Sequence, residues 1–298
     1  MLAQLRLFAL TTLTMVAFAA NSVLCRLALR APGGARGGVE AAIDPASYTA
    51  LRLLSGALVL AVIVRLRRAR TGRSDGGSWP SALALAGYAI AFSYAYLQLP
   101  AGTGALLLFG AVQLTMIAGA LVRGERPRPA QWLGYVVALA GMVVINLPSL
   151  EPPPLGAAGL MIGAGIAWGI YSLRGRGAAR PIEVTAGNFL RSVPLALGLA
   201  GVAVATTSHL SATGVWLALV SGGVASGLGY CLWYLVLPAL GAARGAIVQL
   251  AVPAITAGSA IALLDEPLRR PVAIGGAIIL GGLAIALWPR RVAPVPDR

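Results

Sequence analysis

Long apolar runs, separated by short polar connections, dominate this chain. Ten runs of about 20 residues can be drawn, and a helix of that length crosses a hydrocarbon core of ~30 Å. They are Leu7–Ala28, Ala46–Val64, Ser81–Leu99, Gly102–Val122, Ala130–Leu147, Leu155–Leu173, Val184–Ala205, Val215–Val236, Gly245–Leu264 and Val272–Trp288. A membrane-barrel strand needs only about half that length, so the pattern predicts an all-α integral membrane protein with ten transmembrane helices. Two longer polar connections, Arg30–Pro45 and Arg65–Pro80, are rich in Gly, Arg, Asp and Pro and are expected to be loops.

One stretch of the chain is repeated. Gly104–Glu125 reads GALLLFGAVQLTMIAGALVRGE, and Gly245–Glu266 reads GAIVQLAVPAITAGSAIALLDE, at an offset of 141 residues. We therefore expect a duplication, with the first five-helix repeat in residues 1–150 and the second in residues 151–298, which end in a short tail. Because five is an odd number of spans, the second repeat would be inverted relative to the first. Such repeats enclose a central cavity near the membrane midplane.

Composition and charge agree with a membrane location. Of the 298 residues, 58% are hydrophobic and 11% are charged, which excludes an ordinary soluble domain. With the N-terminus in the cytoplasm, 16 of the 23 arginines lie on that side and 5 on the other. The location that we expect is the inner membrane of a bacterium, and this distribution predicts that both termini lie in the cytoplasm. The distribution also explains the net charge of +14, so this charge does not indicate a nucleic-acid partner. The expected partners are the lipid bilayer and a small-molecule substrate, and we favour a monomer.

The motifs, taken in their order along the chain, resemble the drug/metabolite transporter (DMT) superfamily, in particular its ten-helix EamA-type members. FAANSVLCR (Phe18–Arg26) and IAWGIYSLR (Ile166–Arg174) resemble the first helix of each half, and GGVASGLGYCLWYLVLPALGAARGA (Gly222–Ala246) resembles the passage from the eighth helix to the ninth. The resemblance implies a secondary transporter of small organic solutes, often an exporter of amino acids. The nearest subgroup is the bacterial aromatic amino acid exporters of the YddG kind. The chain departs from the family at Ala20-Asn21, where Trp-Gly is usual.

Charged groups inside the spans are few. None of the ten spans contains Asp or Glu, whereas cation antiporters and proton-coupled pumps usually need a carboxylate in the membrane. The sequence therefore favours uniport or exchange. Arg52 and Arg191 lie about two turns inside matching spans of the two halves. They could attract a substrate carboxylate, or they could snorkel or hold loop carbonyls, which is the more common case for an arginine at this depth.

Aromatic residues at helical spacing suggest a substrate-binding surface. Stacking rings and oriented hydroxyl or indole N–H groups suit an apolar or aromatic side chain. Ordinary packing or an interfacial aromatic belt remains the alternative. The candidate substrate-binding residues, with two deep polar residues, are Tyr88, Phe92, Tyr96, Trp168, Tyr171, Tyr230, Trp233, Tyr234, Asn21 and Gln249.

Small residues and one proline mark candidate packing and hinge positions. Gly165-x-x-x-Gly169 and Gly223-x-x-x-Gly227 allow two helices to approach closely. Pro253 interrupts the ninth run and is expected to kink that helix, because proline lacks an N–H and its ring clashes with the preceding turn.

These observations predict a secondary transporter that exports zwitterionic or neutral metabolites by alternating access. Amino acids, including aromatic ones, are the first candidates. The alternative is a carrier of sugar phosphates or nucleotide sugars, which would need more cationic groups in its cavity. An intramembrane enzyme or a scaffold is a weaker alternative. The sequence shows no metal-ligand cluster, no nucleophile–His–acid set and no Walker motif. We therefore expect no enzyme activity, no cofactor and no metal.

Overall fold

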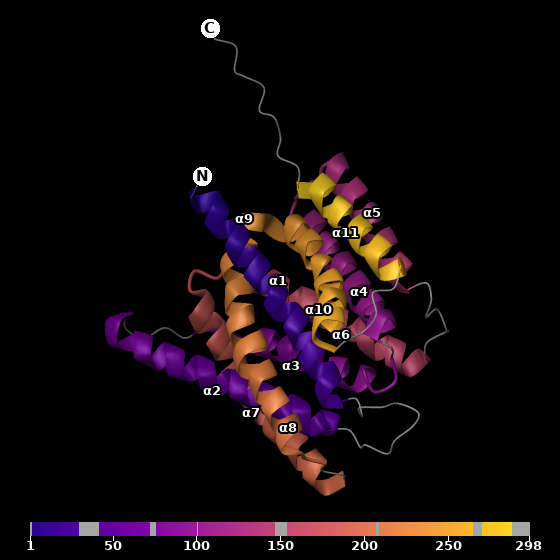
Figure 1. The fold of residues 1–298 in the computed structure, drawn as a ribbon. Coiled ribbons are helices and arrows are strands. Elements are labelled where there is room, and N and C mark those ends of the chain that lie inside the picture. Colours follow the sequence, from indigo (N-terminus) through magenta and orange to yellow (C-terminus); the bar gives the residue numbers. More distant parts are fainter. Residues whose placement is uncertain are drawn as a thin grey trace.

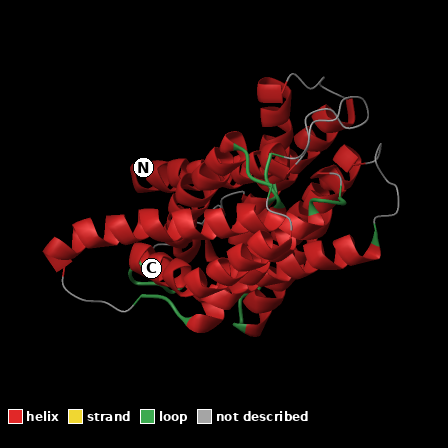
Figure 2. Ribbon diagram, turned by 90° about the horizontal axis from the view of Figure 1, so that it is seen from below, coloured by secondary structure: helices red, strands yellow, loops and turns green. Residues whose placement is uncertain are grey.

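The fold is helical. The computed structural model describes residues 2–29, 42–71, 76–99, 101–146, 154–206, 209–264 and 270–287. Within them the only extended pairing is a bridge between Ile43 and Leu210, and Figure 2 shows helices joined by short loops. The helices are α1 (Leu2–Leu29), α2 (Pro45–Thr71), α3 (Trp79–Ala95), α4 (Ala101–Val122), α5 (Pro129–Asn146), α6 (Leu155–Gly175), α7 (Pro181–Thr206), α8 (Ala212–Val220), η2 (Ser221–Leu228), α9 (Gly229–Gln249), α10 (Ala251–Leu264) and α11 (Arg270–Leu287).

Within the ranges that the structure describes, six stretches are long and apolar enough to cross a membrane, by length and composition. They are Gln4–Leu29, Pro45–Leu66, Gly104–Val122, Leu155–Gly175, Pro181–Thr206 and Ala212–Gln249. Two shorter apolar helices, Pro129–Val144 and Ala273–Leu287, accompany them. The integral membrane class is therefore supported, and the division into ten spans and inverted repeats stays a prediction.

One of the two predicted loops was partly wrong. Helix α2 continues to Thr71, so the beginning of Arg65–Pro80 is helical. Leucine and arginine propagate a helix well, and the extension carries both types. Most of the other loop, Arg30–Pro45, and the repeated Glu266 lie outside the described residues.

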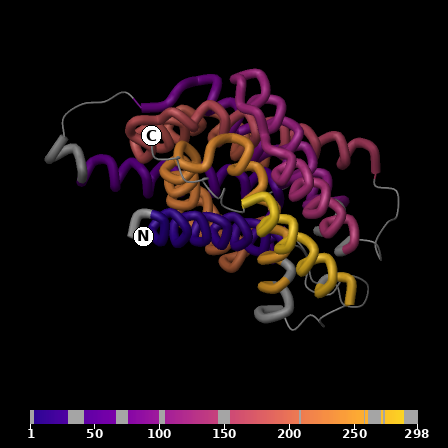
Figure 3. The backbone as a smooth tube through the Cα atoms, turned by 90° about the horizontal axis from the view of Figure 1, so that it is seen from above, coloured from indigo at the N-terminus to yellow at the C-terminus, as the bar shows by residue number. Residues whose placement is uncertain are grey.

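Helices that are distant in sequence pack side by side. Helix α5 lies along α11, and α2 lies along α7. Helix α6 contacts both α3 and α4, while α1 contacts η2, α9 and α10. Figures 1 and 3 show α5 and α11 together on one side of the bundle. Each of these pairings joins residues before 150 to residues after 154.

The stretch from α8 to α10 is irregular. Eight residues, Ser221–Leu228, form the π-helix η2, a form that occurs mostly in short segments and often at functional sites. At Gly241 the backbone has φ 76° and ψ 167°, which is a glycine conformation, and it bends α9. The helix breaks again at Leu250, so Pro253 lies in the first turn of α10, where its missing N–H costs no helical hydrogen bond.

Candidate functional site

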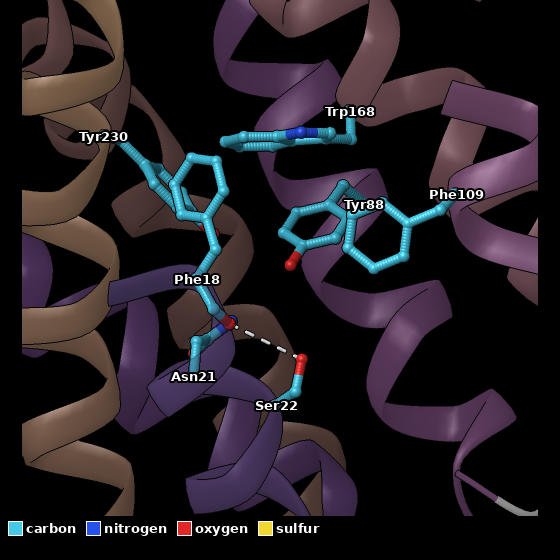
Figure 4. Close-up of a pocket in the computed structure, with 7 residues that line it drawn as sticks. All are labelled: Phe18, Asn21, Ser22, Tyr88, Phe109, Trp168 and Tyr230. Atoms are coloured by element: carbon cyan, nitrogen blue, oxygen red, sulfur yellow. Dashed lines mark hydrogen bonds between the residues drawn. The ribbon is translucent and has the colours of Figure 1, made fainter. Parts of the chain in front are cut away.

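A narrow pocket lies between helices from both parts of the chain. Figure 4 shows its lining residues converging from α1, α3, α4, α6 and α9. The cavity volume is about 20 Å³, which is room for about one water molecule. An amino acid could enter only if side chains or helices separate. The lining residues are Phe18, Asn21, Ser22, Tyr88, Phe109, Trp168 and Tyr230.

Aromatic rings form most of the pocket wall. The Trp168 ring centroid lies 4.6 Å from that of Tyr230, 5.2 Å from that of Tyr88 and 5.2 Å from that of Phe18. The Phe18 and Trp168 planes meet at 88°, the edge-to-face arrangement that ring quadrupoles favour. Three of these four rings were predicted from the sequence. Together they offer an apolar, polarisable surface to a flat or aliphatic group.

Arg52 lies behind this wall and is 1% exposed. Its Nη2 donates to the hydroxyl of Tyr230 at 2.7 Å and to that of Tyr88 at 3.3 Å, and its Nε donates to Ser226 Oγ at 2.9 Å. Its Nη1 has no hydrogen-bond partner among the described residues. The guanidinium carbon lies 5.3 Å from the Tyr88 ring centroid, a cation–π distance. A buried cation therefore has only neutral partners in the described part of the chain.

Asn21 ends a hydrogen-bonded chain that begins at Tyr48. The Tyr48 hydroxyl donates to Ser221 Oγ at 2.9 Å, and Ser221 Oγ donates to Asn21 Oδ1. Ser226 Oγ, which accepts from Arg52, donates to the same oxygen at 3.5 Å. All five side chains are buried. The network joins α1, α2 and η2 beside the pocket and fixes the orientation of the Asn21 amide.

Gln249 supports the pocket from behind. Trp168 Nε1 donates to Gln249 Oε1 at 2.7 Å, and Gln249 Nε2 donates to Met116 Sδ at 3.1 Å and to the Gly245 carbonyl at 3.4 Å. Gln249 is fully buried. It therefore sets the position of the indole and does not line the pocket itself.

Five other aromatic candidates also lie outside the pocket wall. Trp233 Nε1 donates to Ser172 Oγ at 2.9 Å, and the Tyr234 hydroxyl donates to the Tyr171 carbonyl at 2.9 Å, so α9 is bound to α6. The ring of Phe92 on α3 and the ring of Tyr96 directly after α3 meet edge to face with their centroids 4.7 Å apart. The five are Phe92, Tyr96, Tyr171, Trp233 and Tyr234.

Arg191 contacts backbone carbonyls. Its Nη1 donates to the Gly76 carbonyl at 2.7 Å and to the Gly187 carbonyl at 3.1 Å. It thereby holds the segment that precedes α3 against α7. Of the two arginines that the sequence placed within spans, only Arg52 contacts pocket residues.

The predicted small-residue positions lie at close helix contacts. A Cβ atom on Gly165 would lie 2.4 Å from the Leu108 carbonyl oxygen, and one on Gly169 would lie 2.7 Å from Thr115 Cβ. These contacts hold α6 against α4. Gly227 is less crowded, since its nearest neighbour, the Gly222 carbonyl oxygen, would lie 3.2 Å from an added Cβ.

The end of the bundle at which α6 ends and α7 begins is closed by polar contacts. Arg174 Nε donates to Ser81 Oγ at 3.0 Å. Arg176 forms an ion pair with Glu125. Both pairs connect residues before 150 with residues after 154, as the Arg191 contact does. Opening the bundle at this end would break them.

Several residues of the site were not among the sequence candidates. Phe18 lines the pocket with Asn21 and Ser22, and their spacing of three and four residues places all three on one helical face. That spacing was a usable signal. Phe109 stands in an apolar run with nothing to distinguish it. Tyr48 belongs to a network that appears only when α2 and η2 meet.

A sequence model of the EamA-like transporter family matches residues 7–147 and again residues 155–288. An uncharacterized protein of Pseudomonas aeruginosa is 50% identical over 285 residues, which cover 96% of each chain. A probable amino-acid metabolite efflux pump of Salmonella typhimurium is 27% identical over 69% of this chain and 73% of its own, and a protein of the same description from Escherichia coli is 26% identical over 70% and 75%. A solved crystal structure with 22% identity shares the fold, with a TM-score of 0.71 over 94% of this chain and 99% of the other.

Proposed function

The chain belongs to the EamA-like transporter family, and from that premise we propose that it exports small zwitterionic or neutral metabolites, with amino acids, aromatic ones included, as the first candidates. Two relatives named as probable amino-acid metabolite efflux pumps support this choice. We place the protein in the inner membrane of a bacterium, with both termini in the cytoplasm, as the arginine distribution predicts.

The observation that carries the proposal is the pocket itself. It combines aromatic rings, suited to an apolar or aromatic side chain, with a small group of polar atoms at one side. Ligand sites commonly pair an apolar lining with a few placed polar groups. An amino acid has the same division between its side chain and its polar head.

The distribution of cations favours amino acids over sugar phosphates or nucleotide sugars. A phosphate group carries up to two negative charges and is usually held by several cationic side chains. In the described part of the chain, Arg52 contacts the pocket residues, whereas Arg191 is bound to the Gly76 and Gly187 carbonyls. One guanidinium suits a single carboxylate better than a phosphate.

The proposed mechanism is alternating access by uniport or exchange. The two separate matches of the family model support a duplicated chain, and the pairing of α5 with α11 and of α2 with α7 is the arrangement that two inverted repeats would give. Rocking of one half against the other would break the ion pair between Arg176 and Glu125 and open the pocket at that end. The pocket lining contains no Asp or Glu to carry a proton.

Transport by the purified protein in liposomes tests the proposal. Liposomes loaded with unlabelled L-phenylalanine should accumulate labelled L-phenylalanine without a pH gradient or ATP, and protein-free liposomes should not. Trp168→Ala and Tyr230→Ala should slow this exchange while the amount of folded protein is kept. Exchange that responds only to organic phosphates, or that both variants leave unchanged, would contradict the proposal.

A further inference from the structure

The hydrogen bonds of Arg52 dictate where neighbouring hydroxyl protons point. A guanidinium has five N–H donors and no acceptor. The oxygens of Tyr88, Tyr230 and Ser226 can therefore only accept from it, as their distances of 3.3, 2.7 and 2.9 Å show. Each of these three hydroxyls keeps its own proton for a different acceptor. Arg52 thus sets the polarity of the groups around it.

The orientation of the Asn21 side-chain amide is also set by these hydrogen bonds. Ser226, which accepts from Arg52, donates to Asn21 Oδ1, and Ser221 donates to that oxygen as well. With Oδ1 occupied by two donors, the side-chain group that Asn21 can offer to a ligand is its NH₂ group, with two N–H donors. Asn21 lines the pocket and is 3% exposed.

The two tyrosines offer donors of the same kind. Both phenols accept from Arg52, and the hydroxyls of Tyr88 and Tyr230 lie within hydrogen-bonding reach of each other. If one hydroxyl donates to the other, at least one O–H proton is still left over. Both tyrosines line the pocket, and Figure 4 shows the Tyr88 hydroxyl pointing toward Asn21 and Ser22.

Charge adds to this arrangement. The Nη1 group of Arg52 lacks a hydrogen-bond partner, and the described residues supply no carboxylate to neutralise the guanidinium. A buried cation without an anion is costly, and an anion placed close to it offsets part of that cost. Ser22 differs from the other polar lining residues, because its hydroxyl donates to the Phe18 carbonyl and so offers lone pairs.

We propose that Asn21, Tyr88 and Tyr230 form a subsite for the carboxylate group of the substrate, and that Arg52 is the positioning residue that keeps their unused N–H and O–H donors directed toward the pocket. The inference rests on the proposed function and names the chemical group by which the substrate is selected. An anion is accepted by this side of the pocket, and an amine without a carboxylate is rejected by the donors and by the charge of Arg52.

Two analogues of phenylalanine test the subsite in the wild-type protein. The analogue 3-phenylpropionate keeps the carboxylate and lacks the amine, and phenethylamine keeps the amine and lacks the carboxylate. The thermal stability of the purified full-length protein is measured with each, because this readout does not depend on transport. We expect 3-phenylpropionate to raise the melting temperature at concentrations at least tenfold lower than phenethylamine. Equal effects, a stronger effect of phenethylamine, or no effect of either would overturn the inference.

Failure of the proposed function gives a different result. In that case labelled L-phenylalanine does not exchange in liposomes, while the ratio between the two analogues in the stability assay still reports on the subsite. Conversely, exchange of L-phenylalanine that phenethylamine inhibits as strongly as 3-phenylpropionate would keep the proposed function and remove the subsite.

Substitutions of Arg52 distinguish a role in positioning the donors from a purely structural role. Arg52→Lys retains a cation with donors only, so the preference for 3-phenylpropionate should persist. Arg52→Gln introduces an amide oxygen that accepts from the tyrosine hydroxyls and turns their protons away from the pocket. The ratio between the effective concentrations of phenethylamine and 3-phenylpropionate should then fall toward one. If Arg52 had a purely structural role, its loss would weaken the binding of both analogues alike and leave the ratio of their effective concentrations unchanged. That result would overturn the assignment.

Conservative tyrosine variants keep the test available if the Arg52 variants fail to fold. Tyr88→Phe and Tyr230→Phe keep the rings and remove the donors, and each should reduce the preference severalfold. Tyr135→Phe is the matched control, because it removes a buried hydroxyl that donates to the Ala243 carbonyl outside the pocket. A preference that falls equally in all three variants, or in none, would overturn the inference.

Discussion

Replacement of Gly222 by alanine should separate η2 from α2. A Cβ atom at this position would lie 2.1 Å from the Arg52 carbonyl oxygen and 2.0 Å from Ser55 Oγ. The serine hydroxyl can rotate away, but the carbonyl belongs to the backbone of α2 and cannot. Since Cβ contacts shorter than 3.0 Å are essentially never seen, the two helices must move apart by about 0.9 Å.

This separation would act directly on the pocket. Ser226 and Tyr230 follow Gly222 on one continuous helical stretch and would move with it. The distance from Arg52 Nη2 to the Tyr230 hydroxyl, now 2.7 Å, would grow to about 3.6 Å, which is beyond hydrogen-bond range. Overpacking costs about 1–3 kcal/mol, and loss of a hydrogen bond to a charged group costs about 1.5–3 kcal/mol. Together they predict a loss of roughly 2.5–6 kcal/mol of stability.

Thermal unfolding of purified protein in detergent measures the effect, and exchange in liposomes measures its functional consequence. A loss of this size lowers the melting temperature of a chain of this length by roughly 10 °C. Gly223→Ala is the matched control, because its added Cβ would lie 3.0 Å from Val59 Cγ2, the end of a side chain that can adjust. We expect it to cost less than about 1 kcal/mol. Equal stability and equal exchange in the two variants would refute the reasoning.

Two further substitutions test stability and transport. Gly175→Ala would place a Cβ 1.8 Å from Cζ of the buried Tyr234 and should destabilise the protein by about 1–3 kcal/mol. Its control, Gly177→Ala, meets no atom within 4 Å and should leave stability unchanged. Identical melting temperatures of the two variants would show that α6 and α9 can adjust. Trp168→Phe keeps a ring in the pocket but leaves Gln249 Oε1 without its donor. This should cost about 1–3 kcal/mol of stability and raise the KM for exchange severalfold. An unchanged KM would show that the indole N–H does not help to position the ring.

Much of the helical fold could be predicted because apolar run length alone constrains a helix that crosses a membrane. Most helix limits agree with the sequence to within a few residues, as for Leu155–Gly175. The sequence did not reveal how the last runs divide. The run Gly245–Leu264 is shared between α9 and α10, with a break at Leu250, and the corner at Gly241 depends on a single backbone conformation.

The site was harder to predict because it depends on contacts between distant segments. Tyr88, Trp168 and Tyr230 were identifiable because aromatic residues near the middle of a span are conspicuous. Their spacing did not show which aromatic rings would face the pocket, since Trp233 lies three residues beyond Tyr230 and yet binds Ser172. The sequence also presented the two span arginines as equivalent, and only the packed structure distinguishes the contacts of Arg52 from those of Arg191.

The position of Arg52 has an electrical consequence. It is the eighth residue of α2, so its backbone lies roughly 10 Å from the start of that helix. In the proposed topology, this depth lies within the region across which a membrane voltage falls. In the proposed alternating-access cycle, the pocket beside this fixed charge would open to water first on one face of the bilayer and then on the other, so the membrane voltage would act differently on the two states. Moving a full elementary charge across 100 mV corresponds to ~2.3 kcal/mol, and a fraction of that already changes the ratio of the states severalfold. Turnover would then depend on the membrane potential even when the transported molecule has no net charge.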